Sequence, residues 1–164
     1  MRETHRKQIR LPNFDYSSQG AYFVTICTHG RIPLFGQIVP DSSVGAALCG
    51  RPNASDAMIA KWLLEIEHKF TGVSIDTFCI MPDHIHFILL ISSGDSSLSD
   101  IVGWFKSMTT NEYIRGVRKG LYAPFQHRFW QRNYYEHIIR NEQDLSETRA
   151  YIAANPHRQL ERKP

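Results

Sequence analysis

The chain has 164 residues, of which 42% are hydrophobic and 21% are charged, and its formal net charge is +3. This is the length of one domain and the composition of a soluble globular protein, so collagen-like, coiled-coil and disordered classes are excluded. No apolar run approaches the ~18–20 residues that span a bilayer, and the first residues predict no signal peptide. Three widely spaced cysteines indicate reduced cytosolic thiols and no disulfide framework. We therefore expect a cytoplasmic protein with no membrane partner and a single domain over residues 1–164.

Positive charge is concentrated in two segments. Residues 1–10 hold four basic residues and one acidic residue, and residues 101–140 hold seven basic and two acidic ones, whereas residues 11–100 hold four basic and nine acidic ones. This distribution permits a polyanion site, and a solvated basic helix explains it equally well. We interpret residues 1–12 as a flexible basic arm.

The first half of the chain predicts strands, a loop and a helix. Residues 21–28 are rich in β-branched and aromatic side chains, which favours a strand, and a second short strand is expected over residues 33–36. Residues 36–55 contain Gly, Pro, Asp, Ser and Asn with weak periodicity, which indicates a surface loop. Apolar residues then recur at helical spacing over residues 57–70, with an N-cap at 55–56.

The middle of the chain predicts a β-hairpin followed by a helix. Residues 73–80 and 84–92 are expected to be strands, joined by a turn at 81–83 that contains a proline. A long helix is expected over residues 96–119, and Gly120 closes it.

The last elements complete a recognisable order. A short strand is expected over residues 125–131 and a final helix over residues 142–154, which Pro156 stops because the residue before a proline disfavours helical geometry. The order βαββαβ plus one helix is that of an α+β, ferredoxin-like fold. Two helices would cover one face of an antiparallel sheet, and the other face would be free for a site.

Two histidines, His84 and His86, are separated by one residue on an expected strand. Residues i and i+2 of a strand project to one face, so the two imidazoles stand side by side and can converge on one divalent ion. Ile85, Phe87 and Leu89 would point into the core. The alternative is a polar strand face whose histidines are satisfied by neighbours or water, and it is favoured for this pattern taken alone.

Tyr151 and Asn155 lie four residues apart on the final expected helix and therefore share one of its faces. Tyrosine can act as a nucleophile when its phenolate is stabilised, and an amide oxygen suits a hard divalent cation. A core tyrosine beside an asparagine near a helix end explains the pair without any function, and this alternative is favoured for the pair taken alone.

A third pattern covers residues 129–140, where aromatic side chains alternate with arginine and amide groups. Aromatic rings stack on bases while arginine and lysine hold phosphates, so the pattern is typical of a nucleic-acid surface. An edge strand and turn with ordinary aromatic packing explains it equally well.

These three motifs follow one another as Met81-Pro82-Asp83-His84-Ile85-His86, residues 130–141 and Tyr151-Ile152-x-x-Asn155-Pro156. In this order, and with the first expected strand, they resemble the REP-associated tyrosine transposases. Those proteins are relatives of the single-strand insertion-sequence transposases among the HUH nucleases (His, hydrophobic, His). The resemblance covers most of residues 6–160 and is weakest in the loop 36–55. The family more often has asparagine where this chain has Asp83.

The resemblance implies a metal-dependent endonuclease and strand transferase that acts on single-stranded, hairpin-forming palindromic repeats. Tyr151 would attack the scissile phosphate and form a 5′-phosphotyrosine intermediate. His84, His86 and Asn155 would bind Mg²⁺ or Mn²⁺.

Two other tyrosines, Tyr134 and Tyr135, are rival nucleophiles. They rank lower because Ile138 and Ile139, four residues on, cannot bind a metal.

The partner implied by the resemblance is single-stranded or hairpin DNA, bound by a monomer or a homodimer. The candidate DNA contacts are Arg6, Lys7, Arg10, Lys106, Arg132, His137 and Arg140. Arg115, Arg118 and Lys119 rank lower because the C-terminal dipole of the long helix already favours cations there.

Two other functions remain open from the residues. One is a non-catalytic nucleic-acid-binding module of ferredoxin-like fold. The other is a metallohydrolase that uses His84 and His86 with a carboxylate such as Asp83.

Overall fold

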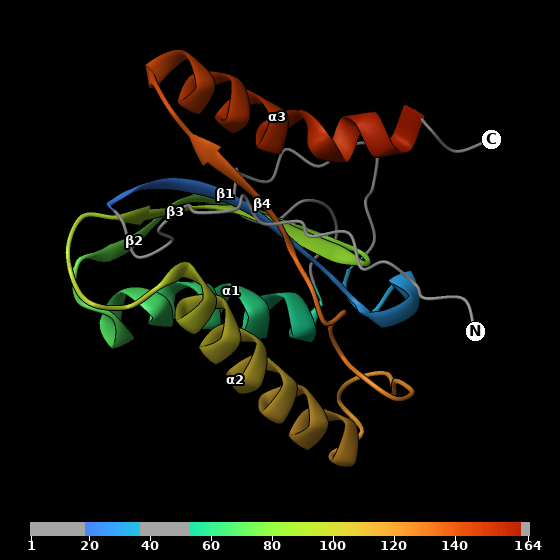
Figure 1. The fold of residues 1–164 in the computed structure, drawn as a ribbon. Coiled ribbons are helices and arrows are strands. Elements are labelled where there is room, and N and C mark those ends of the chain that lie inside the picture. Colours follow the sequence, from blue (N-terminus) through green and yellow to red (C-terminus); the bar gives the residue numbers. More distant parts are fainter. Residues whose placement is uncertain (1–18, 37–52, 162–164) are drawn as a thin grey trace, which may run out of the picture.

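The structure of the protein, a computed structural model, describes residues 19–36 and 53–161 (Figure 1). The predicted arm at 1–12, with Arg6, Lys7 and Arg10, lies outside the described residues, as does most of the predicted loop 36–55.

Four strands form one antiparallel sheet in the order β2-β3-β1-β4. The central strands β1 (Gly20–Cys27) and β3 (His84–Ile91) pair along their whole length. Strand β2 (Val73–Met81) forms a hairpin with β3, and β4 (Tyr135–Ile139) pairs with the other edge of β1. With the helices between them, these strands give the predicted α+β ferredoxin-like βαββαβ arrangement.

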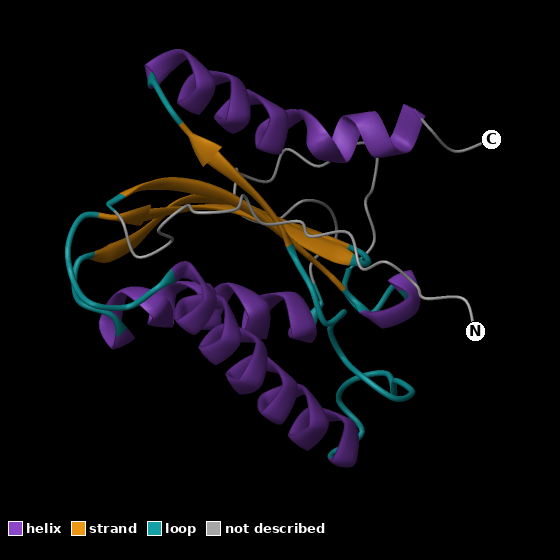
Figure 2. Ribbon diagram, viewed as in Figure 1, coloured by secondary structure: helices purple, strands orange, loops and turns teal. Residues whose placement is uncertain are grey.

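The three α-helices of the described residues lie in two layers, one on either side of the sheet (Figure 2). Helices α1 (Ala54–Lys69) and α2 (Leu98–Arg118) cover one face, and α3 (Glu142–Glu161) lies across the other (Figure 1). The face expected to be free therefore carries α3. None of the helices in the described part of the chain has the length and hydropathy needed to cross a membrane.

The alternation of side chains along β1 and β3 separates two apolar clusters. Ile85, Phe87 and Leu89 point towards α1 and α2 and are fully buried in the main core, as predicted. Side chains of the opposite parity, such as Phe23 and Ile88, pack with Ile152 of α3 in a smaller cluster. Each buried residue of this size contributes roughly 1.5–3 kcal/mol to folding, so this pattern fixes which strand face carries His84 and His86.

The N-cap residues of α1 and α2 have side chains that accept hydrogen bonds from backbone N–H groups in the first turn of each helix. Asn53 accepts hydrogen bonds from the backbone N–H groups of Ser55 and Asp56, so α1 begins earlier than the predicted cap at 55–56. Ser97 caps α2 in the same way through Asp100.

Two predicted strands are wrong. Residues 125–131 form no strand, because Phe125, Phe129 and Trp130 pack as core side chains; their backbone contributes only an isolated bridge between Thr28 and Trp130 within the described residues. The short strand expected over 33–36 is likewise an irregular segment, in which Phe35 is buried and its N–H donates to the carbonyl of Pro82.

The predicted stop at Pro156 is also wrong, because α3 continues past it to Glu161. A proline within a helix removes one N–H donor, and here that loss does not end the helix.

Of the cysteines, Cys27 has a free thiol, whereas Cys79 is disulfide-bonded, so the prediction of reduced thiols is wrong for Cys79.

Candidate functional site

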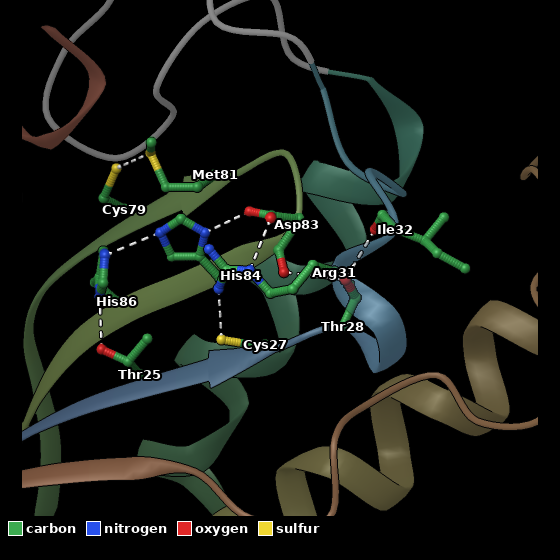
Figure 3. Close-up of polar contacts among 10 residues, drawn as sticks. All are labelled: Thr25, Cys27, Thr28, Arg31, Ile32, Cys79, Met81, Asp83, His84 and His86. Atoms are coloured by element: carbon green, nitrogen blue, oxygen red, sulfur yellow. Dashed lines mark hydrogen bonds and ion pairs between the residues drawn. The ribbon is translucent and has the colours of Figure 1, made fainter. Parts of the chain in front are cut away.

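The side chains of His84 and His86 meet on the face of β3 that carries α3. The Nε2 atoms of the two imidazoles are 3.0 Å apart, and both rings are almost completely buried, with exposed fractions of 6% and 5% (Figure 3). The strand geometry predicted side-by-side rings, and the structure adds that their outer nitrogens point at one another. Two nitrogen atoms in this position can share a proton or a cation.

The Nδ1 atom of each histidine has a polar neighbour that fixes its ring. Nδ1 of His84 donates to Oδ1 of Asp83 at 2.6 Å, and Nδ1 of His86 lies 2.7 Å from the hydroxyl oxygen of Thr25 on the neighbouring strand (Figure 3). Thr25 and His86 are partners in the register of β1 and β3. A hydrogen bond at one ring nitrogen orients the imidazole and leaves the other nitrogen for a ligand.

Asp83 is itself held by Arg31, which belongs to the short helix η1 (His29–Arg31). Nε of Arg31 lies 3.0 Å from Oδ2 of Asp83, and its Nη1 donates to the sulfur of Cys27 at 2.7 Å (Figure 3). A line of polar contacts therefore runs from Arg31 through Asp83 to both histidines. Asp83 stands where the transposases that this sequence resembles more often have asparagine, and its carboxylate is paired with a cation in this chain.

The electrostatic environment favours a neutral His86 and an ionised Asp83. Burial, together with the positive charges of His84 and Arg31, lowers the pKa of His86 to about 3. Burial also tends to raise the pKa of Asp83, but the hydrogen bond from His84 and the charges of His84 and Arg31 outweigh it and hold that pKa below its usual value. At neutral pH, His86 thus has a lone pair on one nitrogen, and a neutral imidazole is the form that binds metals.

Tyr151 of α3 lies beside this histidine pair. Its ring centroid is 5.7 Å from that of His86 and 5.8 Å from that of Phe23, with both contacts edge-on. The tyrosine is 39% exposed, and the guanidinium of Arg158 lies over its ring at 5.5 Å. The structure therefore brings a solvent-accessible phenol and a buried imidazole pair together within one chain.

Asn155 lies one turn further along α3. Its Nδ2 atom is buried and has no hydrogen-bond partner among the described residues, and neither histidine forms a hydrogen bond with it there. A buried amide atom without a partner is uncommon in proteins. The two amide atoms are exchanged by a simple flip of the side chain, so this position can equally present an oxygen to a cation.

The amide is needed if the site is to offer three ligands. In the part of the chain that the structure describes, no cluster of three or more His, Cys, Asp and Glu side chains could hold a metal ion. The candidate ligand set therefore remains two imidazoles, which converge, and the Asn155 amide.

The rival tyrosines lie on opposite faces of the sheet. The hydroxyl of Tyr134 is 3.5 Å from that of Ser99 on α2, and its ring packs against the main core. Tyr135 faces α3, where its ring is 6.2 Å from Phe23 and 53% of the residue is exposed. Geometry therefore separates Tyr134 from the histidine pair, whereas Tyr135 shares its sheet face.

Two predicted DNA contacts have partners within the protein. The ammonium of Lys106 donates to the carbonyls of Gln131 at 2.6 Å and Arg132 at 3.0 Å, and burial lowers its pKa. Nε2 of His137 lies 3.0 Å from each carboxylate oxygen of Asp144. The side chain of Lys106 therefore stabilises the loop that contains Gln131 and Arg132. The position of Lys106 in the sequence does not indicate this contact.

The two remaining described candidates, Arg132 and Arg140, are exposed. Their guanidinium groups are available to an anionic partner.

Comparison with known proteins adds four findings. Residues 53–155 match the family model described as "Transposase IS200 like". The chain is 32% identical over 166 residues to an uncharacterized protein of Haemophilus influenzae strain Rd, covering 93% of this chain and 88% of that protein. It is 31% identical over 92 residues to a protein of the same organism named "Putative REP-associated tyrosine transposase", covering 54% of this chain and 51% of that protein. Among solved structures, it is similar to a REP-associated tyrosine transposase bound to a REP hairpin, with a TM-score of 0.60, 19% identity, and 92% of this chain and 74% of that chain covered.

Proposed function

Because this chain belongs to the IS200-like transposase family, whose members cleave and join DNA, we propose that it nicks and rejoins single-stranded DNA at hairpin-forming palindromic repeats, with Tyr151 as the nucleophile. The observation that carries the proposal is the position of Tyr151 against the buried pair of His84 and His86. The similar solved structure that is bound to a REP hairpin supports hairpin DNA as the substrate class.

The proposed reaction exchanges one ester for another. The phenolic oxygen of Tyr151 loses its proton and attacks the scissile phosphorus, and the bond from phosphorus to the 3′ oxygen breaks. The 3′ oxygen takes up a proton and leaves as a hydroxyl, so the protein carries a 5′-phosphotyrosine. Because the ester bond is conserved, attack by a 3′-hydroxyl reverses the step and rejoins the strand without ATP.

His84, His86 and Asn155 are proposed to hold a divalent cation, Mg²⁺ or Mn²⁺. The converging Nε2 atoms, the neutral state of His86 and the buried amide without a partner all suit such an ion. When bound, the cation would offset the negative charge of the phosphate and orient it. The protein's own contribution is to fix both rings through Asp83 and Thr25.

The test is to trap the covalent intermediate on a denaturing gel. A labelled hairpin oligonucleotide with unpaired flanks is incubated with the protein and Mn²⁺, or with a chelator. We expect a protein–DNA adduct with Mn²⁺ and none with the chelator. Cleaved DNA without an adduct would indicate a water nucleophile, and bound but intact DNA would indicate a non-catalytic module. Either result contradicts the proposal.

Asp83→Ala is expected to weaken Mn²⁺ binding by about 10–100-fold, the usual cost of losing a group that orients a ligating histidine. Asp83→Asn keeps an oxygen that accepts from Nδ1 of His84 and loses only the charge paired with Arg31, so the loss should be several-fold smaller. Isothermal titration calorimetry with Mn²⁺ measures both effects without any turnover. Wild-type affinity in Asp83→Ala would show that the carboxylate does not orient His84.

A further inference from the structure

Strand β2, at one edge of the sheet, is irregular at Asp76. Residues 75 and 77 pair with consecutive residues of β3, Leu89 and Ile88. Asp76 lies between them and is therefore the extra residue of a β-bulge. A bulge bends its strand and re-aims a side chain, and bulges are over-represented next to active sites. Here the side chain of Asp76 is directed to α3, on the sheet face that carries the histidine pair.

The carboxylate of Asp76 is bound by Arg149 of α3 through two parallel hydrogen bonds. Nε of Arg149 donates to Oδ2 at 2.8 Å, and Nη2 donates to Oδ1 at 2.5 Å. The side chain of Asp76 is only 14% exposed, against 50% for that of Arg149. Exposed ion pairs contribute little to stability unless they have this bidentate geometry, which is directional because both groups are planar. The pair can therefore hold β2 and α3 in one relative orientation.

A second polar contact holds α3 at the opposite edge of the sheet. There Nε2 of His137 on β4 contacts the carboxylate of Asp144 in the first turn of α3. Ile152, which is 1% exposed, packs in the smaller apolar cluster under the helix. Helix α3 lies across the sheet and is thus fastened to both of its edge strands, β2 and β4 (Figure 1). Apolar burial is non-directional, so the rotation of α3 about its own axis depends on the two polar contacts.

The position of Tyr151 follows from that rotation. Its ring meets those of His86 and Phe23 edge-on, at centroid distances of 5.7 and 5.8 Å. Because Tyr151 is 39% exposed, burial alone does not fix its ring. Arg149 precedes it by two residues, and successive residues of a helix are separated by about 100° around the axis. A rotation of α3 that breaks the contact of Arg149 with β2 therefore also moves the phenol relative to His86.

We propose that Asp76 and Arg149 are positioning residues that fix the rotation of α3 and thereby hold the phenol of Tyr151 at the pair of His84 and His86. This inference rests on the proposed function for the reaction that Tyr151 performs. The ion pair acts through the helix and not on the reacting atoms. A nucleophile that is misplaced by about 1 Å can lose roughly 10²-fold in rate, so a rigid contact this close in sequence to Tyr151 affects the chemistry.

The test measures the rate of adduct formation at saturating Mn²⁺ and saturating hairpin with unpaired flanks. We expect Asp76→Asn and Arg149→Gln each to react about tenfold more slowly than the wild type, a part of the loss that misplacement can cause. The double variant should be no slower than the slower single variant, because both substitutions remove the same contact. Arg149→Lys keeps the charge but loses the planar fork, so it should stay slow as well.

The two single substitutions change the net charge in opposite directions, which separates positioning from DNA binding. In the positioning role, hairpin affinity measured by anisotropy in a chelator stays within about twofold of wild type in both variants, because phosphate contacts lie elsewhere. If Arg149 instead contacted DNA, Arg149→Gln would weaken binding and Asp76→Asn would not, and both would react at the wild-type rate once saturated. That pattern would overturn the positioning role.

The matched control is Lys61→Gln, which removes an exposed cation that pairs with Glu112 on the opposite side of the sheet. It has the same charge change as Arg149→Gln and should form the adduct at the wild-type rate. Thermal unfolding of both variants shows whether a slower rate is only a loss of stability. An equal loss of rate in Lys61→Gln would contradict the assignment to Arg149.

Nuclear magnetic resonance gives a readout that needs neither DNA nor metal. The imidazole signals of His86 should shift in Asp76→Asn and in Arg149→Gln, because the ring of Tyr151 beside them moves, and should stay in place in Lys61→Gln. Unchanged His86 signals in the first two variants would refute the positioning role even if the wild type forms the adduct. Absence of the adduct in the wild type would refute the proposed chemistry, and the His86 signals would still decide whether the ion pair positions Tyr151.

Discussion

Tyr151→Phe is expected to reduce the yield of the covalent protein–DNA adduct by at least roughly 10³-fold, because a missing nucleophile cannot be replaced by the remaining groups of a site. The substitution removes only the phenolic oxygen and keeps the ring that contacts His86 and Phe23, so the helix should stay in place. Binding of the flanked hairpin should remain within about twofold of wild type, since binding depends on phosphate contacts elsewhere. Denaturing gels measure the adduct, and anisotropy measures the binding.

Tyr135→Phe and Tyr134→Phe are the matched controls for this experiment. Tyr135 provides the stricter comparison, because it shares the sheet face of the histidine pair and is more exposed than Tyr151. Both controls should form the adduct at close to the wild-type level. If Tyr135→Phe lost the adduct while Tyr151→Phe retained it, the nucleophile would lie on β4 and the assignment to α3 would be wrong.

The elements that the sequence predicts well are those in which local pattern and burial agree. The alternation of Ile85, Phe87 and Leu89 with His84 and His86 has the period of a strand, and the hairpin and the two strand faces follow from it. The order of strands and helices then determines the fold class, because few topologies accommodate βαββαβ.

The strand predicted over residues 125–131 is wrong because its large side chains have partners that are distant in the sequence. Phe129 and Trp130 have high strand propensity, but each packs into the core against other aromatic rings, which a local pattern cannot show. The fourth strand therefore begins only at Tyr135.

Interactions between distant segments could not be predicted from local sequence patterns. Arg31 and Asp83 are far apart in the chain and meet because η1 follows β1, the partner of β3. Thr25 reaches His86 only through the register of those two strands. In the sequence, Thr25 is recognisable only as a residue of the first expected strand. That position does not identify His86 as its hydrogen-bond partner.

His84→Ala and His86→Ala form the second prediction with a large effect. Each variant removes one of the two Nε2 atoms that lie 3.0 Å apart, so we expect at least about 100-fold weaker Mn²⁺ binding and loss of the metal-dependent adduct. Calorimetry with Mn²⁺ tests binding directly, and circular dichroism tests whether a variant with a vacated buried position still folds. His86→Gln retains a polar group near Thr25 for the case in which alanine unfolds the protein.

His137→Ala is the matched control, because His137 lies on β4 with its Nε2 atom engaged by Asp144. It should bind Mn²⁺ as the wild type does.

Thermal unfolding with and without Mn²⁺ distinguishes two physical roles for the buried imidazoles. If they are ligands, Mn²⁺ raises the thermal unfolding temperature of the wild type and of His137→Ala but not that of folded His84 or His86 variants, because an ion that binds only the native state stabilises it. If they are a polar pair satisfied by Asp83 and Thr25 alone, Mn²⁺ leaves every variant unchanged, and the metal-dependent chemistry proposed for Tyr151 is contradicted with it.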